Sequence, residues 1–198
     1  MLKEIKVKAE IAIVLLHEIY GINKHILNMH KKFEVEGYDA YCVDLLDNKR
    51  FDYEESEEAY AYFMDKVGFD KARLKVLDFL HSICNYYKNI YLVGYSVGGT
   101  VAWLCSEESE LISGVVSYYA SRIRDYMDIE PKVETAVFFP LLEKGFNVEV
   151  LIEKLKEKDK VRIYKFEGLH GFADSCSRYY NSKEKEISEK IISEFICD

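Results

Sequence analysis

The stretch NIYLVGYSVGGTVAWLC, residues 89–105, decides the fold. It begins with the apolar run Asn89–Val93, which predicts a buried strand. The motif G-x-S-x-G follows, and a segment of helical pattern, Val97–Ser106, comes directly after it. A tight turn from strand to helix strains the backbone of the serine at its tip and lifts the hydroxyl above the sheet. Ser96 is therefore the candidate nucleophile.

The start of the expected helix supplies a candidate oxyanion donor. Backbone N–H groups in the first turn of a helix have no partner within it, and the helix dipole favours negative charge there. The Val97 N–H is such a group. The simpler alternative is a glycine-rich turn that happens to contain serine. The strand before the motif, the helix after it and a histidine downstream favour a nucleophile.

Apolar runs alternate with segments of helical period along the chain. The expected strands are Glu10–Leu16, Asp39–Leu45, Asn89–Val93, Ile112–Tyr118, Ala136–Phe139 and Val161–Glu167. The expected helices are Lys24–Glu36, Phe69–Tyr87, Val97–Ser106, Val148–Lys158 and Lys183–Cys197, and the second of them places Leu74, Leu77, Phe79 and Leu80 on one broad face. This alternation predicts an α/β fold: a mostly parallel sheet of about six or more strands with helices on both faces.

Length and composition narrow the class of protein. The chain has 198 residues with only 2 prolines and 10 glycines, which leaves little material for a linker, so we expect one domain over residues 1–198. No apolar run is long enough to span a membrane, and Met1–Glu10 lacks the apolar centre of a secretion signal. The expected location is the cytoplasm, and no membrane partner is expected.

Charge and residue spacing argue against further classes. The net charge of −8 disfavours nucleic acid as a partner, because phosphate binding needs a basic surface. Five cysteines without C-x-x-C spacing indicate reduced thiols. His25 and His30 are five residues apart on an expected helix and point in different directions, so no metal site is expected.

A serine hydroxyl needs a base to become nucleophilic at neutral pH. His170 follows the last expected strand in the loop Gly-Leu-His-Gly-Phe, which gives the chain order serine, acid, histidine. His17 also follows a strand and is the main competitor, but it precedes the serine in sequence. His170 is the candidate general base.

The base needs a carboxylate that orients its ring and stabilises its protonated form. We expect this acid at the end of the strand Ala136–Phe139. Glu143 is the first carboxylate after that strand, and no aspartate occurs between Glu130 and Asp159. Glu143 is therefore the candidate acid, with Glu149, inside the following helix, as the alternative.

Substrate contacts are expected where the strand Ile112–Tyr118 ends. Tyr119 lies directly after it, and Arg122 follows in the same loop. Both are candidates for contacts with the nucleophile or the substrate. Arg50 and Arg124 are alternatives in tyrosine-rich loops.

Three segments resemble the dienelactone hydrolase family of α/β-hydrolases: Leu16–Asn23 (LHEIYGIN), Gly94–Gly99 (GYSVGG) and Gly168–Asp174 (GLHGFAD). The resemblance covers nearly the whole chain and implies the α/β-hydrolase fold. It also implies that Glu18 is a buried glutamate beside the nucleophile and that the backbone N–H of Ile19 completes the oxyanion hole. A structural carboxylate held by local donors is the alternative for Glu18.

The sequence departs from the family pattern at three positions. The namesake enzymes use cysteine where this chain has Ser96, which favours serine-esterase chemistry. The family acid is usually aspartate, whereas Glu143 stands here. The namesake enzymes place an arginine four residues after the histidine, whereas this chain has Asp174. A substrate that carries a carboxylate is therefore not expected to be preferred.

The leading hypothesis is a hydrolase of small esters or lactones, or of thioesters, that forms an acyl-Ser96 intermediate and needs no cofactor. Its expected partner is the small-molecule substrate, and the sequence leaves the oligomeric state open. The alternative is a hydrolase-like protein without catalytic activity that binds a small molecule or a partner. Retention of serine, histidine and a positioned carboxylate together favours catalysis, because a binding protein has no need for all three.

Overall fold

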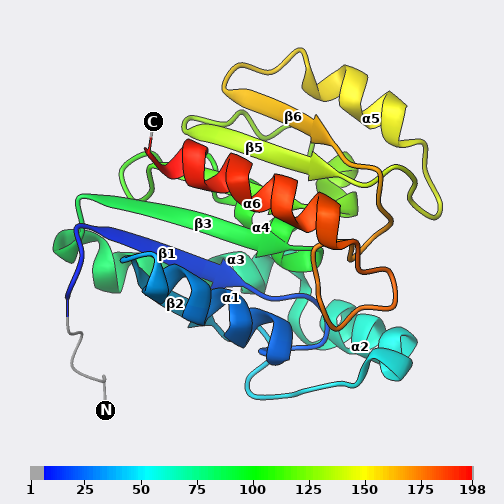
Figure 1. The fold of residues 1–198 in the computed structure, drawn as a ribbon, viewed down its shortest axis with the longest axis horizontal. Coiled ribbons are helices and arrows are strands. Elements are labelled where there is room, and N and C mark those ends of the chain that lie inside the picture. The colour runs from blue at the N-terminus through cyan, green and yellow to red at the C-terminus, as the bar shows by residue number, and fades with distance from the viewer. Residues whose placement is uncertain (1–6, 198) are drawn as a thin grey trace.

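The computed structural model describes residues 7–197, and its centre is a sheet of six parallel strands (Figure 1). The strands are β1 (Ile11–Leu16), β2 (Asp39–Val43), β3 (Asn89–Tyr95), β4 (Gly114–Tyr118), β5 (Glu134–Phe139) and β6 (Val161–Lys165). Their order across the sheet is β2-β1-β3-β4-β5-β6. All six strands expected from the sequence are confirmed, with ends that differ by up to two residues.

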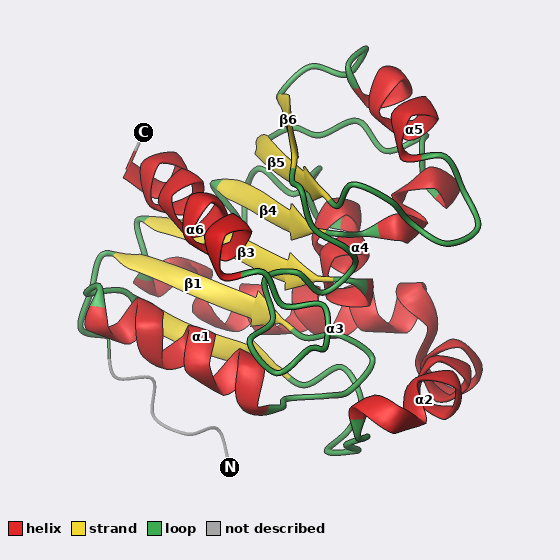
Figure 2. Cartoon of the chain, turned by 45° about the vertical axis from the view of Figure 1, so that its right-hand side comes forward, coloured by secondary structure: helices red, strands yellow, loops and turns green. Residues whose placement is uncertain are grey.

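Helices cover both faces of this sheet. They are α1 (Lys24–Val35), α2 (Ser56–Tyr62), α3 (Gly68–Ile83), α4 (Val97–Leu104), α5 (Val148–Leu155) and α6 (Ser182–Cys197). Helices α1 and α6 lie on one face, and α3 and α4 lie on the other (Figures 1 and 2). The predicted α/β architecture is therefore confirmed. No helix within residues 7–197 is long and apolar enough to cross a membrane.

Strand β1 shows why its sequence is apolar throughout. Ala12, Val14 and Leu16 pack with the core on the side of α3 and α4, whereas Ile13 and Leu15 pack with the core of α1 and α6. Successive side chains of a strand point to opposite faces. Because helices cover both faces, each position must be apolar, and the usual alternation with polar residues disappears.

The long helix α3 corrects one expectation. Its buried residues are Phe69, Ala72, Val76, Leu80 and Ile83, at spacings of three and four residues. Leu74, which the sequence analysis placed on the same face as Leu80, is 58% exposed. The small residue Ala72 lies on the inward face instead, because α3 packs closely against α4.

The register of the neighbouring strands β1 and β3 indicates where a ligand-binding site would lie. Leu16 at the end of β1 pairs with Gly94 near the end of β3. From this pair of strands the chain order runs outward in both directions across the sheet. Ligands of open parallel sheets bind at the carboxyl ends of the strands at such a switch point. The segments that follow β1 and β3 therefore emerge side by side at this edge.

Candidate active site

Ser96 lies at the sharp turn between β3 and α4. Its backbone has φ +54° and ψ −113°, a conformation that non-glycine residues rarely adopt and that stores strain. A Cβ at Gly94 would collide with the Gly98 carbonyl, and a Cβ at Gly98 would collide with the carbonyl oxygens of Leu16 and His17. Only glycine fits at these two positions, which explains the spacing of the motif in physical terms.

His170 connects Ser96 to Glu143. Its Nε2 lies 3.0 Å from Ser96 Oγ, and its Nδ1 lies 2.6 Å from Glu143 Oε1. The structure thus brings together the three residues that the sequence analysis assigned as nucleophile, base and acid. Both distances are within hydrogen-bonding range. The Glu143 side chain is 7% exposed, so water competes little for its carboxylate.

Two loops carry Glu143 and His170, and backbone contacts hold the loops together. The Leu141 N–H donates to the Gly168 carbonyl at 2.7 Å, and Leu142 forms a parallel bridge with Leu169. These contacts extend the pairing of β5 with β6 beyond the strand ends. The residues that follow the bridge are Glu143 and His170, which therefore leave it side by side.

The alternative acid and the alternative base have other partners. Glu149 lies on α5 and forms an ion pair with Lys165. His17 is fully buried, and its two ring nitrogens contact Glu18 O and Leu45 N. Neither residue contacts Ser96 or His170 in a hydrogen bond.

Electrostatics at His170 favour its protonated form. Burial lowers the pKa of its imidazole, but the hydrogen bond and charge of Glu143, with a contribution from Glu18, outweigh burial and raise this pKa above its usual value. The ring of Tyr119 packs beside the imidazole with 4.8 Å between ring centroids. Tyr119 itself has φ +36°, so backbone strain occurs at the ends of both β3 and β4.

Glu18 is a buried carboxyl group at this site, only 5% exposed. Its pKa is raised from 4.5 to about 7, mainly by burial; the charge of His170 acts to lower this pKa and the charge of Asp174 acts to raise it. Glu18 Oε1 has no hydrogen-bond partner among the residues that the structure describes. The sequence resemblance located this glutamate, and the structure places it within electrostatic range of His170.

Two backbone N–H groups, just after β1 and just after β3, are available as donors. The Val97 N–H begins α4, and the Ile19 N–H lies in the segment that follows β1. Within residues 7–197, neither group donates a hydrogen bond to another protein group. Free donors at the carboxyl ends of adjacent strands can stabilise negative charge on a bound oxygen.

The model of the dienelactone hydrolase family matches residues 2–196. The chain belongs to this family. Among curated proteins, the uncharacterized protein YczH of Bacillus subtilis (strain 168) is 37% identical over 172 residues, which cover 85% of this chain and 84% of that protein. The chain is thus a member of a hydrolase family.

Solved structures share the α/β-hydrolase fold at low sequence identity. A candidate dienelactone hydrolase from Klebsiella pneumoniae has a TM-score of 0.76 and 16% identity, over 96% of this chain and 88% of that chain. A dienelactone hydrolase-like promiscuous phosphotriesterase from metagenomic libraries has a TM-score of 0.72 and 14% identity, with coverages of 96% and 87%. Ferulic-acid-bound Est1E from Butyrivibrio proteoclasticus has a TM-score of 0.67 and 13% identity, with coverages of 97% and 92%.

Asp174, which departs from the family pattern, faces the protein interior. Its side chain is fully buried and accepts hydrogen bonds from the Tyr53 hydroxyl and from the Cys176 N–H, the latter at 2.7 Å. His25 Nδ1 lies 3.7 Å from its Oδ1. Asp174 therefore ties the loop after His170 to the loop after β2. Tyr53 carries no sequence signal of this role, because nothing in the sequence indicates its pairing with a residue 121 positions away.

The arginines expected near the substrate have protein partners. Arg122 contacts the Tyr60 hydroxyl at 2.9 Å and Asp125 at 2.8 Å. Arg124 packs over the ring of Phe146, and Arg50 contacts Asp44. Each of these guanidinium groups therefore has at least one contact within the protein.

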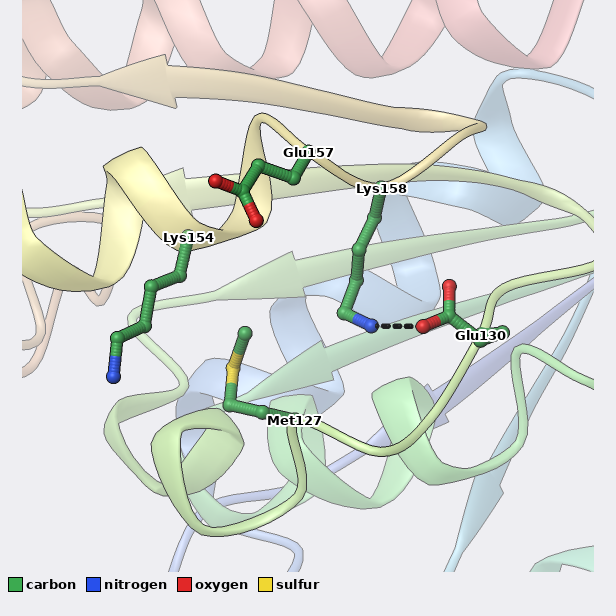
Figure 3. A pocket seen from close by; sticks show the side chains of 5 residues that line it. All are labelled: Met127, Glu130, Lys154, Glu157 and Lys158. Carbon is green, nitrogen blue, oxygen red and sulfur yellow. Dashed lines mark hydrogen bonds and ion pairs between the residues drawn. The ribbon is translucent and has the colours of Figure 1, made fainter.

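The described residues contain no group of three or more histidine, cysteine, aspartate or glutamate side chains that could hold a metal ion. A surface hollow of about 410 Å³ lies among Met127, Glu130, Lys154, Glu157 and Lys158 (Figure 3). These residues precede β5 and β6 in the sequence, so the hollow lies at the edge of the sheet where strands begin. Ser96 lies at the opposite edge, and the hollow is separate from the candidate active site.

Proposed function

We propose that this member of the dienelactone hydrolase family is a serine hydrolase that cleaves small ester or lactone bonds. One observation carries the proposal: a continuous chain of hydrogen-bonding distances from Ser96 Oγ through His170 to Glu143 Oε1. The strained serine at the strand-to-helix turn supports the same function.

In the first half-reaction, His170 Nε2 accepts the Ser96 hydroxyl proton as Oγ attacks the ester carbonyl carbon. Glu143 holds the imidazole by its Nδ1–H and stabilises the positive charge that forms. The Ile19 and Val97 N–H groups donate to the oxyanion of the tetrahedral intermediate. His170 then gives the proton to the leaving alcohol oxygen, and the acyl group stays on Ser96.

In the second half-reaction, a water molecule replaces the alcohol. His170 accepts a proton from this water, whose oxygen attacks the acyl carbon. The bond to Ser96 Oγ then breaks, the proton returns to Oγ, and the carboxylic acid leaves. Every proton moves through the chain's own residues, so this route needs no cofactor. A thioester substrate would use the same groups.

A fluorophosphonate probe tests this proposal directly, because it reacts with an activated serine. We expect labelling at Ser96 alone, located by peptide mass mapping, and near-complete loss of labelling in His170→Ala. We also expect turnover of 4-nitrophenyl acetate that falls on the order of 10⁴-fold or more in Ser96→Ala. Folded protein that shows neither labelling nor turnover would instead support a binding protein without catalytic activity.

A further inference from the structure

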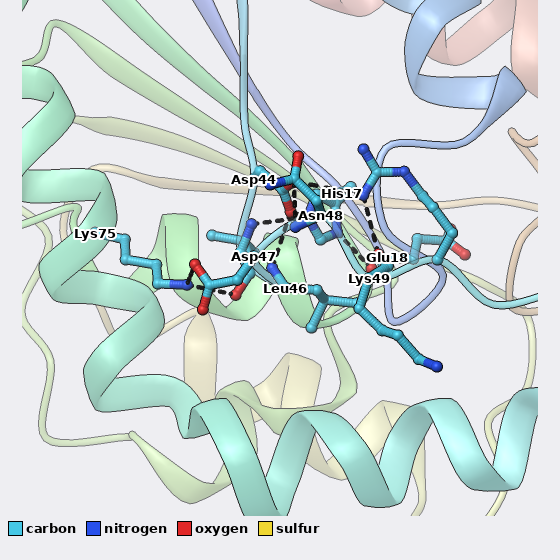
Figure 4. Close-up of polar contacts among 10 residues, drawn as sticks. His17, Glu18, Asp44, Leu46, Asp47, Asn48, Lys49 and Lys75 are labelled. Carbon is cyan, nitrogen blue, oxygen red and sulfur yellow. Dashed lines mark hydrogen bonds and ion pairs between the residues drawn. The ribbon is translucent and has the colours of Figure 1, made fainter. Parts of the chain in front are cut away.

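A second histidine, His17, lies two residues before the proposed oxyanion donor Ile19 in the sequence. His17 follows β1 and is fully buried. Its Nδ1 lies 2.6 Å from the Glu18 carbonyl oxygen, and its Nε2 lies 2.9 Å from the Leu45 backbone nitrogen. These contacts belong to the polar cluster at the ends of β1 and β2 (Figure 4).

The two partners determine where the imidazole carries its proton. A backbone N–H only donates, so Nε2 must accept the bond from Leu45 with its lone pair. A carbonyl oxygen only accepts, so Nδ1 must carry the hydrogen that bonds to Glu18 O. The Asp44 carboxylate lies 3.6 Å from Nε2, which is too long for a competing hydrogen bond. These contacts place a ring hydrogen of His17 on Nδ1 and leave the lone pair of Nε2 to the Leu45 N–H.

The hydrogen bond from Nδ1 fixes the peptide group between Glu18 and Ile19. The Glu18 carbonyl accepts both this bond and the Gly21 N–H at 3.3 Å. In a planar trans peptide, the C=O and the following N–H point in opposite directions. Two donors that hold the Glu18 carbonyl thus also fix the direction of the Ile19 N–H, which has no partner within the described residues.

The loop after β2 holds the other side of the His17 ring. Asp44 accepts the N–H groups of Leu46 at 3.0 Å and Asn48 at 2.9 Å, which closes the loop on itself (Figure 4). Lys75 of α3 donates to the Leu45 carbonyl at 3.1 Å and to Asp47 at 2.7 Å. These contacts hold the peptide group that follows Leu45, next to the peptide that carries the Leu45 N–H, and so help to keep this donor in place for His17.

We propose that His17 is a positioning residue for the oxyanion hole, which it orients by holding the Glu18–Ile19 peptide through its Nδ1–H. This inference rests on the proposed function, in which Ile19 N–H donates to the oxyanion. His17 does not touch the substrate or the reacting atoms. Its Nδ1–H holds the Glu18–Ile19 peptide, and its Nε2 accepts the Leu45 N–H, which connects the ring to the loop after β2.

Two variants separate these sides of the ring. Asparagine carries its amide close to the position of Nδ1, so His17→Asn keeps a donor for Glu18 O and loses the acceptor for Leu45. Glutamine carries its amide close to the position of Nε2, so His17→Gln keeps the acceptor and loses the donor. Both replacements are uncharged and smaller than histidine. The thermal unfolding temperatures of the two variants are measured and compared, so that a loss of stability can be distinguished from a loss of activity.

We expect His17→Gln to lose roughly 10–100-fold in kcat for 4-nitrophenyl acetate with little change in KM, part of the effect of removing an oxyanion donor. Affinity for a trifluoromethyl ketone, which forms a tetrahedral oxyanion on serine, should fall by a similar factor. His17→Asn should keep kcat within a few-fold of the wild type. If kcat falls equally in both variants, and in line with their loss of thermal stability, then His17 has a packing role and the proposal is overturned.

An NMR measurement tests whether His17 holds the Glu18–Ile19 peptide without relying on turnover. Nitrogen-15 shifts of the imidazole should show a protonated Nδ1 and an unprotonated Nε2, and the Ile19 amide signal should move in His17→Gln but little in His17→Asn. A hydrogen on Nε2, or an Ile19 amide unaffected in His17→Gln, would overturn the proposal. Absent Ser96-dependent turnover would contradict the proposed function, while the NMR result would still decide whether His17 holds the peptide.

Discussion

Leu142 pairs with Leu169 in a parallel bridge just beyond the ends of β5 and β6. Glu143 and His170 are the next residues on the two loops, and Glu143 Oε1 lies 2.6 Å from His170 Nδ1. Their relative position thus depends on backbone pairing that continues the sheet. A glutamate, longer than aspartate by one methylene, reaches the histidine from this loop.

The first prediction concerns Glu143→Gln. The change removes the charge that stabilises protonated His170 and keeps the side-chain volume. We expect kcat for 4-nitrophenyl acetate to fall roughly 10²–10⁴-fold, with little change in the unfolding temperature. The matched control is Glu149→Gln, which removes a carboxylate paired with Lys165 and should leave kcat within about two-fold. Equal effects of the two changes would contradict the role of Glu143.

The second prediction is the pH dependence of kcat/KM. The reaction needs neutral His170, and Glu143 raises the pKa of this histidine above its usual value of 6.5 against the opposing effect of burial. The activity of the wild type should therefore rise with pH through a midpoint above 6.5. In Glu143→Gln the midpoint should move to lower pH, because burial then acts with less opposition. A midpoint that moves upward would show that Glu143 does not stabilise the imidazolium.

Sequence patterns predicted the fold well because each β-strand carries its own signal. Both faces of the sheet are covered, so the strands read as continuous apolar runs between segments of helical period. The inward face of α3 was harder to predict. Ala72 lies inward and Leu74 outward, because the close approach to α4 selects a small residue, and hydrophobicity alone does not report this distance.

The candidate site was predictable where a residue belongs to a local motif. Ser96 and His170 have glycine neighbours in a fixed order, and Glu143 was found by its position after a strand. The pairing of Tyr53 with Asp174 was not predictable, because it joins two loops that only the folded chain brings together. The role of His17 was missed for the same reason, since its acceptor contact lies 28 residues away in the chain.

The third prediction tests the turn at Ser96 through Gly98→Ala. A Cβ at this position would meet the backbone carbonyls of Leu16 and His17, and neither is free to move without shifting β1. We expect clear destabilisation or failure to fold, seen as a lower unfolding temperature. The control is Gly37→Ala, where no atom lies within 4 Å of the added Cβ and only the positive φ is strained. A stable Gly98→Ala protein would contradict the close packing of β1 against α4.

The fourth prediction concerns the buried carboxyl of Glu18 and uses folding stability. The folded pKa of about 7 lies above the ordinary value of 4.5, so the folded state holds this proton longer than the unfolded state. The free energy of unfolding should therefore fall as pH rises from about 4.5 to about 7. Glu18→Gln lacks this loss, so it should gain about 2–3 kcal/mol relative to the wild type between pH 5 and pH 8. Urea unfolding of both proteins at the two pH values measures the difference, and an unchanged difference would show that Glu18 ionises freely in the fold.

The last prediction concerns the charge of the substrate. Glu18 is buried within electrostatic range of both His170 and Asp174, and these two carboxyl groups raise the local cost of an additional negative charge. Arg122, a candidate for substrate contacts, is paired with Asp125 and Tyr60. We therefore expect a neutral ester to have a kcat/KM about ten-fold or more above that of its carboxylate-bearing analogue.

The comparison is made at low and high salt in the wild type and in Arg122→Ala, which should leave the ratio nearly unchanged. A preference for the anionic ester that fades with salt and disappears in Arg122→Ala would contradict the prediction, because it would show that this arginine leaves its partners to bind the substrate.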